Sequence, residues 1–300
     1  MKNLALWLLL ITTSAYAGSR DLVKYLPQYS YSVIGADLIP LRDNEVFVSM
    51  ERKGQIWSYE DDSEIVNYFR ILKIDPKKDV KTFVFSKYLN SYGSAGKLHV
   101  FELNQEIAPL LSRKSSTKYL GVALVRLEPD QDRYVVPLDS HTVAMGRLNE
   151  VKMALDLSRG KLPNMTQNLE LKLMLQKLPD RAPVWGMAVP LSRRKAAATN
   201  AKQSTNAMLQ AFQSYYFYGV PAKTNASSHF YGLAKDDKEA AVVTAFMIGT
   251  LAIAKFRANE TLAEVLDQVD IQHNGNNVHV SAVLTKEMVD AFFDGSLGVN

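Results

Sequence analysis

Residues 240–254, AAVVTAFMIGTLAIA, form a run of fifteen residues without a charged side chain in an otherwise mixed sequence. As an α-helix this run spans ~22 Å, which is less than the ~30 Å of the hydrocarbon core of a bilayer. Asp237 and Glu239 precede it and Lys255 follows it, which is the charge order that the dipole of a soluble helix favours. The run therefore predicts a helix that is buried on nearly all sides and does not cross a membrane.

The run also has an internal order of small and large side chains. Three small residues spaced four apart share one helix face: Ala241, Ala245 and Gly249. Three large residues form a ridge on another face: Val243, Met247 and Leu251. A small-residue face lets another backbone approach closely, and such faces also occur in dimers of membrane helices. The length and the flanking charges, rather than this face, favour a soluble core.

The N-terminal residues, MKNLALWLLLITTSAYA, have the three-part order of a secretory signal peptide. Lys2 provides the basic start, residues 4–11 are apolar, and small residues surround the end of the segment at Ala17. A short membrane anchor is the alternative, but the apolar run is about half of the ~20 residues that a span needs. We expect cleavage after Ala17, a signal peptide of residues 1–17, and export to the periplasm or the medium.

The composition is that of a folded globular protein, because 47% of the residues are hydrophobic and 22% are charged. A formal net charge of +4 is too small to indicate binding to nucleic acid, which usually requires clustered Lys and Arg. The absence of cysteine excludes disulfides, thiolate ligands for metals and lipid attachment to a cysteine. Stability must come from burial, and we expect no cofactor.

The order of predicted elements divides the mature chain into two α+β units, residues 18–180 and 181–300. Each reads strand, helix, strand, strand, helix, strand, strand, helix, and residues 143–155 can be laid over residues 280–292 at the last strand–helix junction. Asn274-Gly275 predicts the tip of a hairpin in the second unit. The predicted fold is two tandem ferredoxin-like (βαββαββα) units with antiparallel sheets.

Three segments carry a resemblance to a known group of proteins: LKIDPKKDVKTFVFS, VPLDSHTVAMGRLNEVKMALDL and APVWGMAV. Together with the closing strand–strand–helix, they resemble exported bacterial proteins of uncharacterised function, whose "GxDPxxDV" turn leads into a first hairpin. Ile74 stands where that turn more often has a Gly-hydrophobic pair. The resemblance implies an α+β fold and an export route, and it implies no activity and no functional residues.

Catalytic and metal-binding patterns are weak in this sequence. His273 and His279 flank the Asn274-Gly275 turn and are expected to be exposed hairpin histidines, since no third metal ligand lies near them in sequence. Asp139 and His141 are separated by one residue, but neighbours in a strand point to opposite faces, so Asp139-Ser140-His141 does not form a triad. The sequence predicts neither a metal site nor catalytic residues.

The strand SYYFYG is the best candidate for a binding surface. Alternation places Tyr216 and Tyr218 on one face, and Arg193 and Arg194 lie upstream as further candidate binding residues. Tyrosine also favours strands, so an ordinary structural role is the alternative. We predict a non-enzymatic exported protein that binds a protein or another component of the cell envelope. A hydrolase whose carboxylates converge only in three dimensions is the second hypothesis.

Overall fold

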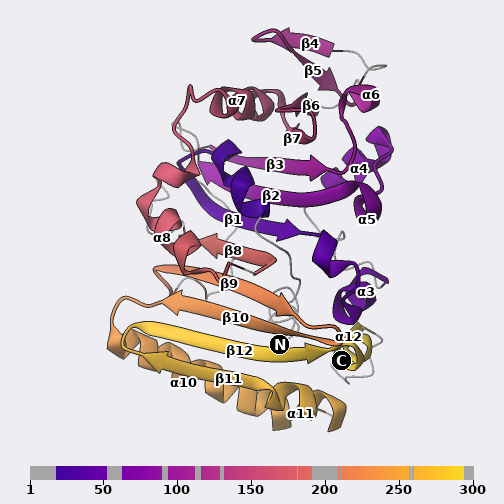
Figure 1. The fold of residues 1–300 in the computed structure, drawn as a ribbon. Coiled ribbons are helices and arrows are strands. Elements are labelled where there is room, and N and C mark those ends of the chain that lie inside the picture. The colour runs from indigo at the N-terminus through magenta and orange to yellow at the C-terminus, as the bar shows by residue number, and fades with distance from the viewer. Residues whose placement is uncertain are drawn as a thin grey trace. The chain divides into compact units, whose positions relative to one another are not determined.

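The computed structural model describes residues 18–52, 63–89, 94–111, 116–128, 132–180, 182–190, 209, 211–256, 258 and 260–293 (Figure 1). These residues form two compact units. The N-terminal unit contains residues 18–39 and 63–177, and the C-terminal unit contains residues 40–52 and 178–293. The sequence-based division placed residues 40–52 in the first half of the chain. The predicted signal peptide, residues 1–17, lies outside the described residues.

The N-terminal unit has a sheet of seven strands in the order β1-β2-β3-β7-β6-β5-β4, with antiparallel pairing throughout. Residues of β2 alternate between buried and partly buried, as expected of a strand with one face on a core. The strands are β1 (Ser30–Asp37), β2 (Val80–Leu89), β3 (Ala95–Leu103), β4 (Ser116–Tyr119), β5 (Val122–Arg126), β6 (Tyr134–Pro137) and β7 (Thr142–Gly146).

The helices of this unit include α7, whose side chains Val151 and Ala154 are buried against β3, β6 and β7. Pro76 opens the one-turn helix α5, and Asp75 caps it by accepting a hydrogen bond from the amide of Lys77. The helices are α2 (Gly18–Asp21), η1 (Leu22–Tyr25), α4 (Ser63–Leu72), α5 (Pro76–Asp79), α6 (Ala108–Leu111), α7 (Leu148–Ser158), η3 (Met165–Gln167) and α8 (Leu169–Lys177).

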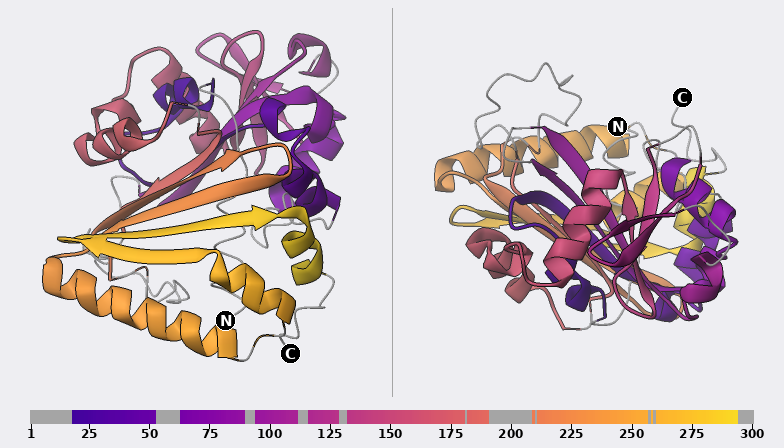
Figure 2. Two further views of the ribbon diagram at one scale, coloured as in Figure 1. Left: turned by 60° about the horizontal axis from the view of Figure 1, so that its bottom comes forward. Right: turned by 90° about the horizontal axis from the view of Figure 1, so that it is seen from above.

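The C-terminal unit has five antiparallel strands in the order β11-β12-β10-β9-β8 (Figure 2). The predicted hairpin is confirmed, with Gly275 in the left-handed region at φ 56° between β11 and β12. Its strands are β8 (Val184–Ala188), β9 (Ser214–Pro221), β10 (Asn225–Leu233), β11 (Val269–Asn274) and β12 (Asn277–Thr285). Its helices are α3 (Glu45–Arg52), α10 (Asp237–Phe256), α11 (Glu260–Asp267) and α12 (Lys286–Phe293), and η2 (Ile39–Leu41) precedes α3.

Residues 40–52 join this unit through specific contacts of α3 and of Asn44, the residue before it. The side-chain amide of Asn44 donates hydrogen bonds to the carbonyls of Ala222 and Asn225, at 2.5 and 3.1 Å. The Ser49 hydroxyl donates to the carboxylate of Asp290 on α12. A segment that follows β1 in sequence therefore belongs to the C-terminal unit, which local sequence patterns do not reveal.

The predicted class, α+β with antiparallel sheets, is confirmed, and five strands of each unit share one order. In each unit three consecutive strands form a meander, and the second strand of a later hairpin pairs with the third strand of that meander. The resulting strand orders are β1-β2-β3-β7-β6 and β8-β9-β10-β12-β11. A ferredoxin-like unit instead places a third strand between two parallel strands joined by a helix. The ferredoxin-like part of the prediction is therefore wrong, because element order does not determine long-range pairing.

Two further predictions differ from the structure in detail. The sequence of residues 118–128, KYLGVALVRLE, predicts one strand, but the structure has a hairpin of β4 and β5 here, because Leu120 and Gly121 take φ values of 50° and 81°. The overlay of residues 143–155 on 280–292 joins equivalent strand–helix junctions, but it is shifted by one residue. Val143 lies opposite Phe101, whereas Val280 lies opposite Phe230, and these positions are on opposite faces of the corresponding strands.

Candidate functional site

Helix α10 packs on the sheet through one face. Its contacts are with β11, β12 and α11, and its buried side chains include the predicted ridge of Val243, Met247 and Leu251. Leu251 and Leu266 of α11 form the centre of a small hydrophobic cluster. Figures 1 and 2 show the helix alongside β11, with its far side turned away from the sheet. The ridge is therefore the packing face of this helix.

The opposite face of α10 is exposed, so the prediction of a helix buried on nearly all sides is wrong. Ala245 and Gly249 are exposed, and a methyl group added at Gly249 would meet no atom within 4 Å. The small residues thus do not receive another backbone within the described structure. Five of the ten exposed large hydrophobic side chains among the described residues lie on this helix: Val242 (62% exposed), Phe246 (63%), Ile248 (48%), Ile253 (55%) and Phe256 (91%).

The exposed face of α10 offers no charge and no free hydrogen-bonding side chain between Ala240 and Ala254. Thr250 donates its hydroxyl to the carbonyl of Phe246 at 2.9 Å, one turn earlier. By length and composition α10 qualifies as a membrane span among the described helices, and 28% of its most apolar stretch is buried. An exposed apolar surface of this kind marks an interaction site more often than a free solvent-facing surface.

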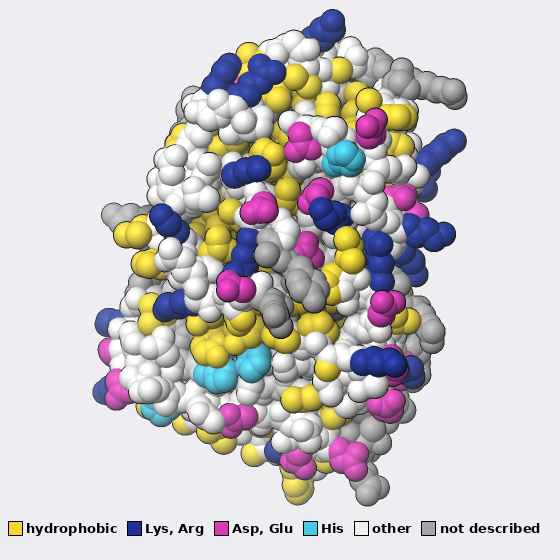
Figure 3. Space-filling model, in the orientation of Figure 1, with side chains coloured by type: hydrophobic (Ala, Val, Ile, Leu, Met, Phe, Trp, Pro, Cys, Tyr) yellow, Lys and Arg dark blue, Asp and Glu magenta, His cyan; other side chains and the backbone are white. Residues whose placement is uncertain are grey.

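The aromatic side chains predicted from the strand SYYFYG lie on the sheet of the same unit. Tyr216 and Tyr218 of β9 share one face, as predicted, because Tyr216 lies opposite Tyr231 and Tyr218 opposite His229 of β10. His279 of β12 lies opposite Tyr231 and extends the group across a third strand. We call these five partly buried residues the aromatic cluster. Figure 3 shows histidine side chains beside a hydrophobic patch over these strands.

Within the aromatic cluster the rings contact one another face to face. Tyr216 and Tyr231 have ring centres 4.8 Å apart and planes within 10°, and Tyr231 and His279 are 4.3 Å apart and within 14°. Tyr218 and His229 are 4.8 Å apart and within 26°. Because the rings stack on their neighbours, little ring face remains free for a ligand to stack on. The cluster contributes to the packing of β9, β10 and β12.

The two histidines of the cluster meet edge to edge. Nδ1 of His229 and Nε2 of His279 are 3.3 Å apart, and the ring planes are within 5° although the ring centres are 5.6 Å apart. A neutral imidazole donates from one nitrogen and accepts at the other, so this contact holds one shared hydrogen bond. Protonation of both rings would place two donors against each other. Sequence spacing did not reveal this pair, because fifty residues separate its members.

Burial shifts the acid–base properties of the aromatic cluster. Burial and the neighbouring His279 lower the pKa of His229, and burial lowers that of His279 against the opposing effect of Asp270. Burial, and then Tyr231, raise the pKa of Tyr216 to about 12, and burial raises that of Tyr218 as well. These shifts favour the neutral forms of Tyr216, Tyr218, His229 and His279 near pH 7.

The N-terminal unit carries a matching set of rings at equivalent positions. Opposed positions on its second and third strands hold Phe85 with His99 and Phe83 with Phe101. The Phe85–His99 rings are 4.7 Å apart and within 22°, close to the geometry of the Tyr218–His229 pair.

The surroundings of the two sets differ. His99 and Phe101 are buried, and Phe69 of α4 packs edge-on against Phe101 with ring centres 5.1 Å apart. The set in the C-terminal unit is only partly buried and has tyrosines where the N-terminal unit has phenylalanines. Tyrosine hydroxyls suit a surface that is in part exposed to water.

The other candidate residues are placed as follows. Arg193 and Arg194 lie outside the described residues. His273 lies opposite Val278 and His279 opposite Gln272, so His273 and His279 occupy different faces of the hairpin. Among the residues that the structure describes, no three His, Asp or Glu side chains gather as metal ligands.

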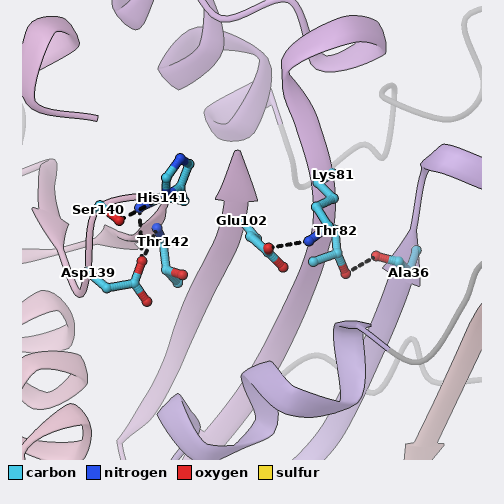
Figure 4. A network of polar contacts seen from close by, with 8 residues as sticks. All are labelled: Ala36, Lys81, Thr82, Glu102, Asp139, Ser140, His141 and Thr142. Carbon is cyan, nitrogen blue, oxygen red and sulfur yellow. Dashed lines mark hydrogen bonds and ion pairs between the residues drawn. The ribbon is translucent and has the colours of Figure 1, made fainter. Parts of the chain in front are cut away.

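A cavity of about 480 Å³ in the N-terminal unit bears on the hydrolase hypothesis, since Glu106, Asp139 and Ser140 help to line it. Ser140 Oγ and His141 Nδ1 are 2.8 Å apart in the turn between β6 and β7 (Figure 4). The amides of His141 and Thr142 donate to Asp139 at 2.9 and 2.7 Å, so they are not available to stabilise an oxyanion.

Asp139 is suited to anchoring this turn. Burial alone would raise its pKa, but hydrogen bonds from His141, Thr142 and Tyr25 outweigh burial and lower the pKa. A carboxylate held ionised by several donors does not serve as the general acid that glycoside hydrolysis requires. The cavity therefore gives the hydrolase hypothesis no positive support.

No protein-family model matches the chain, and no curated protein matches its sequence. Among solved structures, crystal form III of TP0453 has a similar fold, with a TM-score of 0.50, 9% sequence identity, and coverage of 91% of this chain and 97% of that one. Crystal forms I and IV of TP0453 give TM-scores of 0.48 and 0.45, at 9% and 10% identity, with coverage of 93% and 90% of this chain and 98% and 94% of theirs. At this level of identity the likeness concerns the fold alone.

Proposed function

We propose that this protein is an exported, non-enzymatic α+β protein that docks on a lipid surface of the cell envelope through the exposed face of α10. The observation that carries the proposal is the exposure of Val242, Phe246, Ile248, Ile253 and Phe256 on one helix whose central fifteen residues carry no charge. Transfer of such side chains from water to an apolar environment contributes about 25 cal/mol per Å² of apolar surface removed from water.

The chemistry of this face favours lipid over a protein partner. A protein interface carries about one hydrogen bond per 100–200 Å² and is enriched in Tyr, Trp and Arg at its centre. The exposed face of α10 consists of aliphatic side chains, phenylalanine and small residues, and its one hydroxyl, on Thr250, bonds within the helix. Hydrocarbon requires no hydrogen-bonding partner from the protein, so it fits this face better.

The packing of α10 favours a helix that lies on the membrane. Met247 and Leu251 are buried against the unit, and a membrane-spanning position would remove them from that packing. An interfacial helix buries its apolar side by ~5–10 Å into the boundary between headgroups and acyl chains. Lys238, near the start of the helix, has a stem long enough to extend to the headgroups, whereas Lys255, near its end, pairs with Asp267 at 2.7 Å.

The other parts of the proposal concern export and internal symmetry. Cleavage after Ala17 would deliver the protein to the envelope, where lipid surfaces are present. The common strand order and the matching ring pairs support a tandem origin of the two units from one α+β ancestor, as does the similar series of elements. The resemblance of the sequence to an uncharacterised family of exported proteins agrees with both export and a tandem origin.

Flotation with phosphatidylcholine vesicles, with and without an anionic lipid, tests the proposal. We expect the chain beginning at Gly18 to float with both kinds of vesicle, and Phe246→Ser with Ile253→Ser to reduce the floating fraction at least tenfold. The matched control is Leu169→Ser with Leu173→Ser, which alters two exposed leucines of α8 (70% and 50% exposed). The control should float like the wild type.

Two outcomes would overturn the proposal. One is flotation that the α10 variant leaves unchanged. The other is a dimer in sedimentation analysis that the same variant converts to a monomer while the wild type does not float, because the face would then be covered by a second copy. Intact mass of the protein recovered from the cell envelope tests the export step separately, with Gly18 expected as the first residue.

A further inference from the structure

Asp37, at the end of β1, has a buried carboxyl group of which only one oxygen is hydrogen-bonded. Its residue is 5% exposed, and its Oδ2 has no hydrogen-bond partner among the described residues. The neighbouring hydroxyl of Thr82 donates to the carbonyl of Ala36 at 2.8 Å, so its single proton is already engaged there (Figure 4). Leaving a buried carboxylate oxygen unpaired costs free energy that a further donor would recover.

The nearest donors to Asp37 come from the start of the described chain. Backbone amides of Ser19 and Gly18 donate hydrogen bonds to the carboxyl group. Burial nonetheless raises the pKa of Asp37 to about 6, since it outweighs the hydrogen bonds from Ser19 and Gly18, and the charge of Glu102 also raises it. Glu102 is itself paired with Lys81 at 2.6 Å. Among the described residues, no positive charge offsets the burial of the Asp37 carboxyl group.

Gly18 fits closely against this carboxyl group. A methyl group built on its α-carbon would lie 2.9 Å from Oδ1 of Asp37, so a side chain at this position would collide with the carboxylate. Gly18 is also the residue that follows the predicted cleavage site at Ala17. The backbone nitrogen of Gly18 is therefore both the atom that the predicted cleavage would release and a neighbour of a buried carboxyl group with an unpaired oxygen.

We propose that removal of residues 1–17 creates an α-ammonium group at Gly18 that pairs with Asp37 and fastens the mature N-terminus to β1 and β2. This inference rests on the proposed export step. Signal peptidase hydrolyses the Ala17–Gly18 peptide bond: the carbon–nitrogen bond breaks, and water supplies a hydroxyl to the Ala17 carbonyl and a hydrogen to the Gly18 nitrogen. The proton lost by the new carboxylic acid balances the one gained by the amine.

The exchange of an amide for an ammonium changes the site in two ways. The amide has one N–H, whereas the ammonium has three, so it can serve both Oδ1 and the unpaired Oδ2 of Asp37. It also brings the positive charge that the carboxylate lacks. A buried carboxylate with a charged partner is stabilised, whereas one without a partner is costly. Processing would therefore stabilise the folded N-terminal unit.

Two purified chains test this inference: one that begins at Gly18 and one that retains Ala17 in front of it. Carboxyl carbon NMR should show the pKa of Asp37 near 6 in the extended chain and below its ordinary value of ~3.9 in the chain beginning at Gly18. The chain beginning at Gly18 should melt at a higher temperature. Asp37→Asn should abolish this difference between the two chains.

Acetylation of Gly18 in the wild-type chain provides a second route that needs no substitution. It restores an uncharged amide and should lower the melting temperature to that of the extended chain. Equal melting temperatures and equal Asp37 pKa values in the two chains would overturn the inference, as would a difference that persists in Asp37→Asn. These chains are compared in purified form, so failure of export or of vesicle binding would be seen separately.

Discussion

The two faces of α10 have nearly the same chemistry and different surroundings. On one face Val243, Met247 and Leu251 are packed against the C-terminal unit, and on the other Val242 and Phe246 are more than half exposed. A helix that is apolar all round is usually buried all round. Here the fold covers only one side, and the second side has retained apolar residues. The difference shows that hydrophobic residues on α10 serve two purposes, folding and, in our proposal, attachment to lipid.

The largest expected effect is on the free energy of unfolding, and it separates the residues of α10 that stabilise the fold from those proposed to contact lipid. Met247→Ala should lower the free energy of unfolding by about 2–5 kcal/mol, because it removes a buried side chain and leaves a cavity. Phe246→Ala, one residue earlier on the exposed face, should change it by less than about 0.5 kcal/mol. Urea denaturation of both variants measures the difference. Equal losses would show that the exposed face is part of the folded core, contrary to the structure.

The aromatic cluster on the sheet of the same unit is expected to stabilise the fold and not to bind lipid. Tyr216→Ala with Tyr218→Ala should lower the free energy of unfolding by about 1–3 kcal/mol, since two stacked ring pairs are lost at about 0.5–1.5 kcal/mol each. Vesicle flotation by the folded variant should be unchanged. A variant of wild-type stability that fails to float would transfer the binding role from α10 to these tyrosines.

The smallest expected effect is a dependence of stability on pH. Because the pKa values of His229 and His279 are lowered in the folded state, the unfolded chain binds more protons once the pH falls below ~6.5. Stability from the neutral pair is fully present above that pH and is lost progressively as the pH falls. The loss should be modest, because both imidazole rings are partly exposed to water.

Substitution of single histidines isolates this contribution. Between pH 7.5 and pH 5.5 the urea midpoint of His279→Asn should fall less than that of the wild type. His273 is exposed on the other face of the hairpin, so the midpoint of His273→Asn should fall as much as that of the wild type. Differences from the wild type are compared because the buried carboxyl group of Asp37 also contributes to the pH dependence of stability. An identical response in both variants would contradict the assignment to the histidine pair.

Local features of the fold were predictable from the sequence because they depend on nearby residues. Asn274-Gly275 specified a hairpin, and alternation placed Tyr216 and Tyr218 on one face. The order of strand pairing was not predictable, since the contact of β3 with β7 joins residues about forty positions apart. The same limit explains why no local pattern indicates that α3 packs with the C-terminal unit.

The candidate site shows the same division between local and distant information. The apolar character of residues 240–254 is evident in the sequence, but its exposure depends on which neighbours the fold supplies. The partnership of His229 with His279 depends on the alignment of β10 with β12. A residue pattern predicts that a helix is apolar, and only the packed structure shows which of its faces lacks a partner.

The most direct measurement uses the absence of cysteine from the chain, which allows a single label at a chosen position. A polarity-sensitive fluorophore is attached at Ala245→Cys, on the exposed face of α10, and at Leu173→Cys, on α8, as the control. On addition of phosphatidylcholine vesicles the label at position 245 should shift its emission to shorter wavelength and be quenched by a quencher placed in the acyl chains, while the label at position 173 should not respond. An unchanged signal at position 245, with vesicles in excess, would contradict the attachment of α10 to lipid.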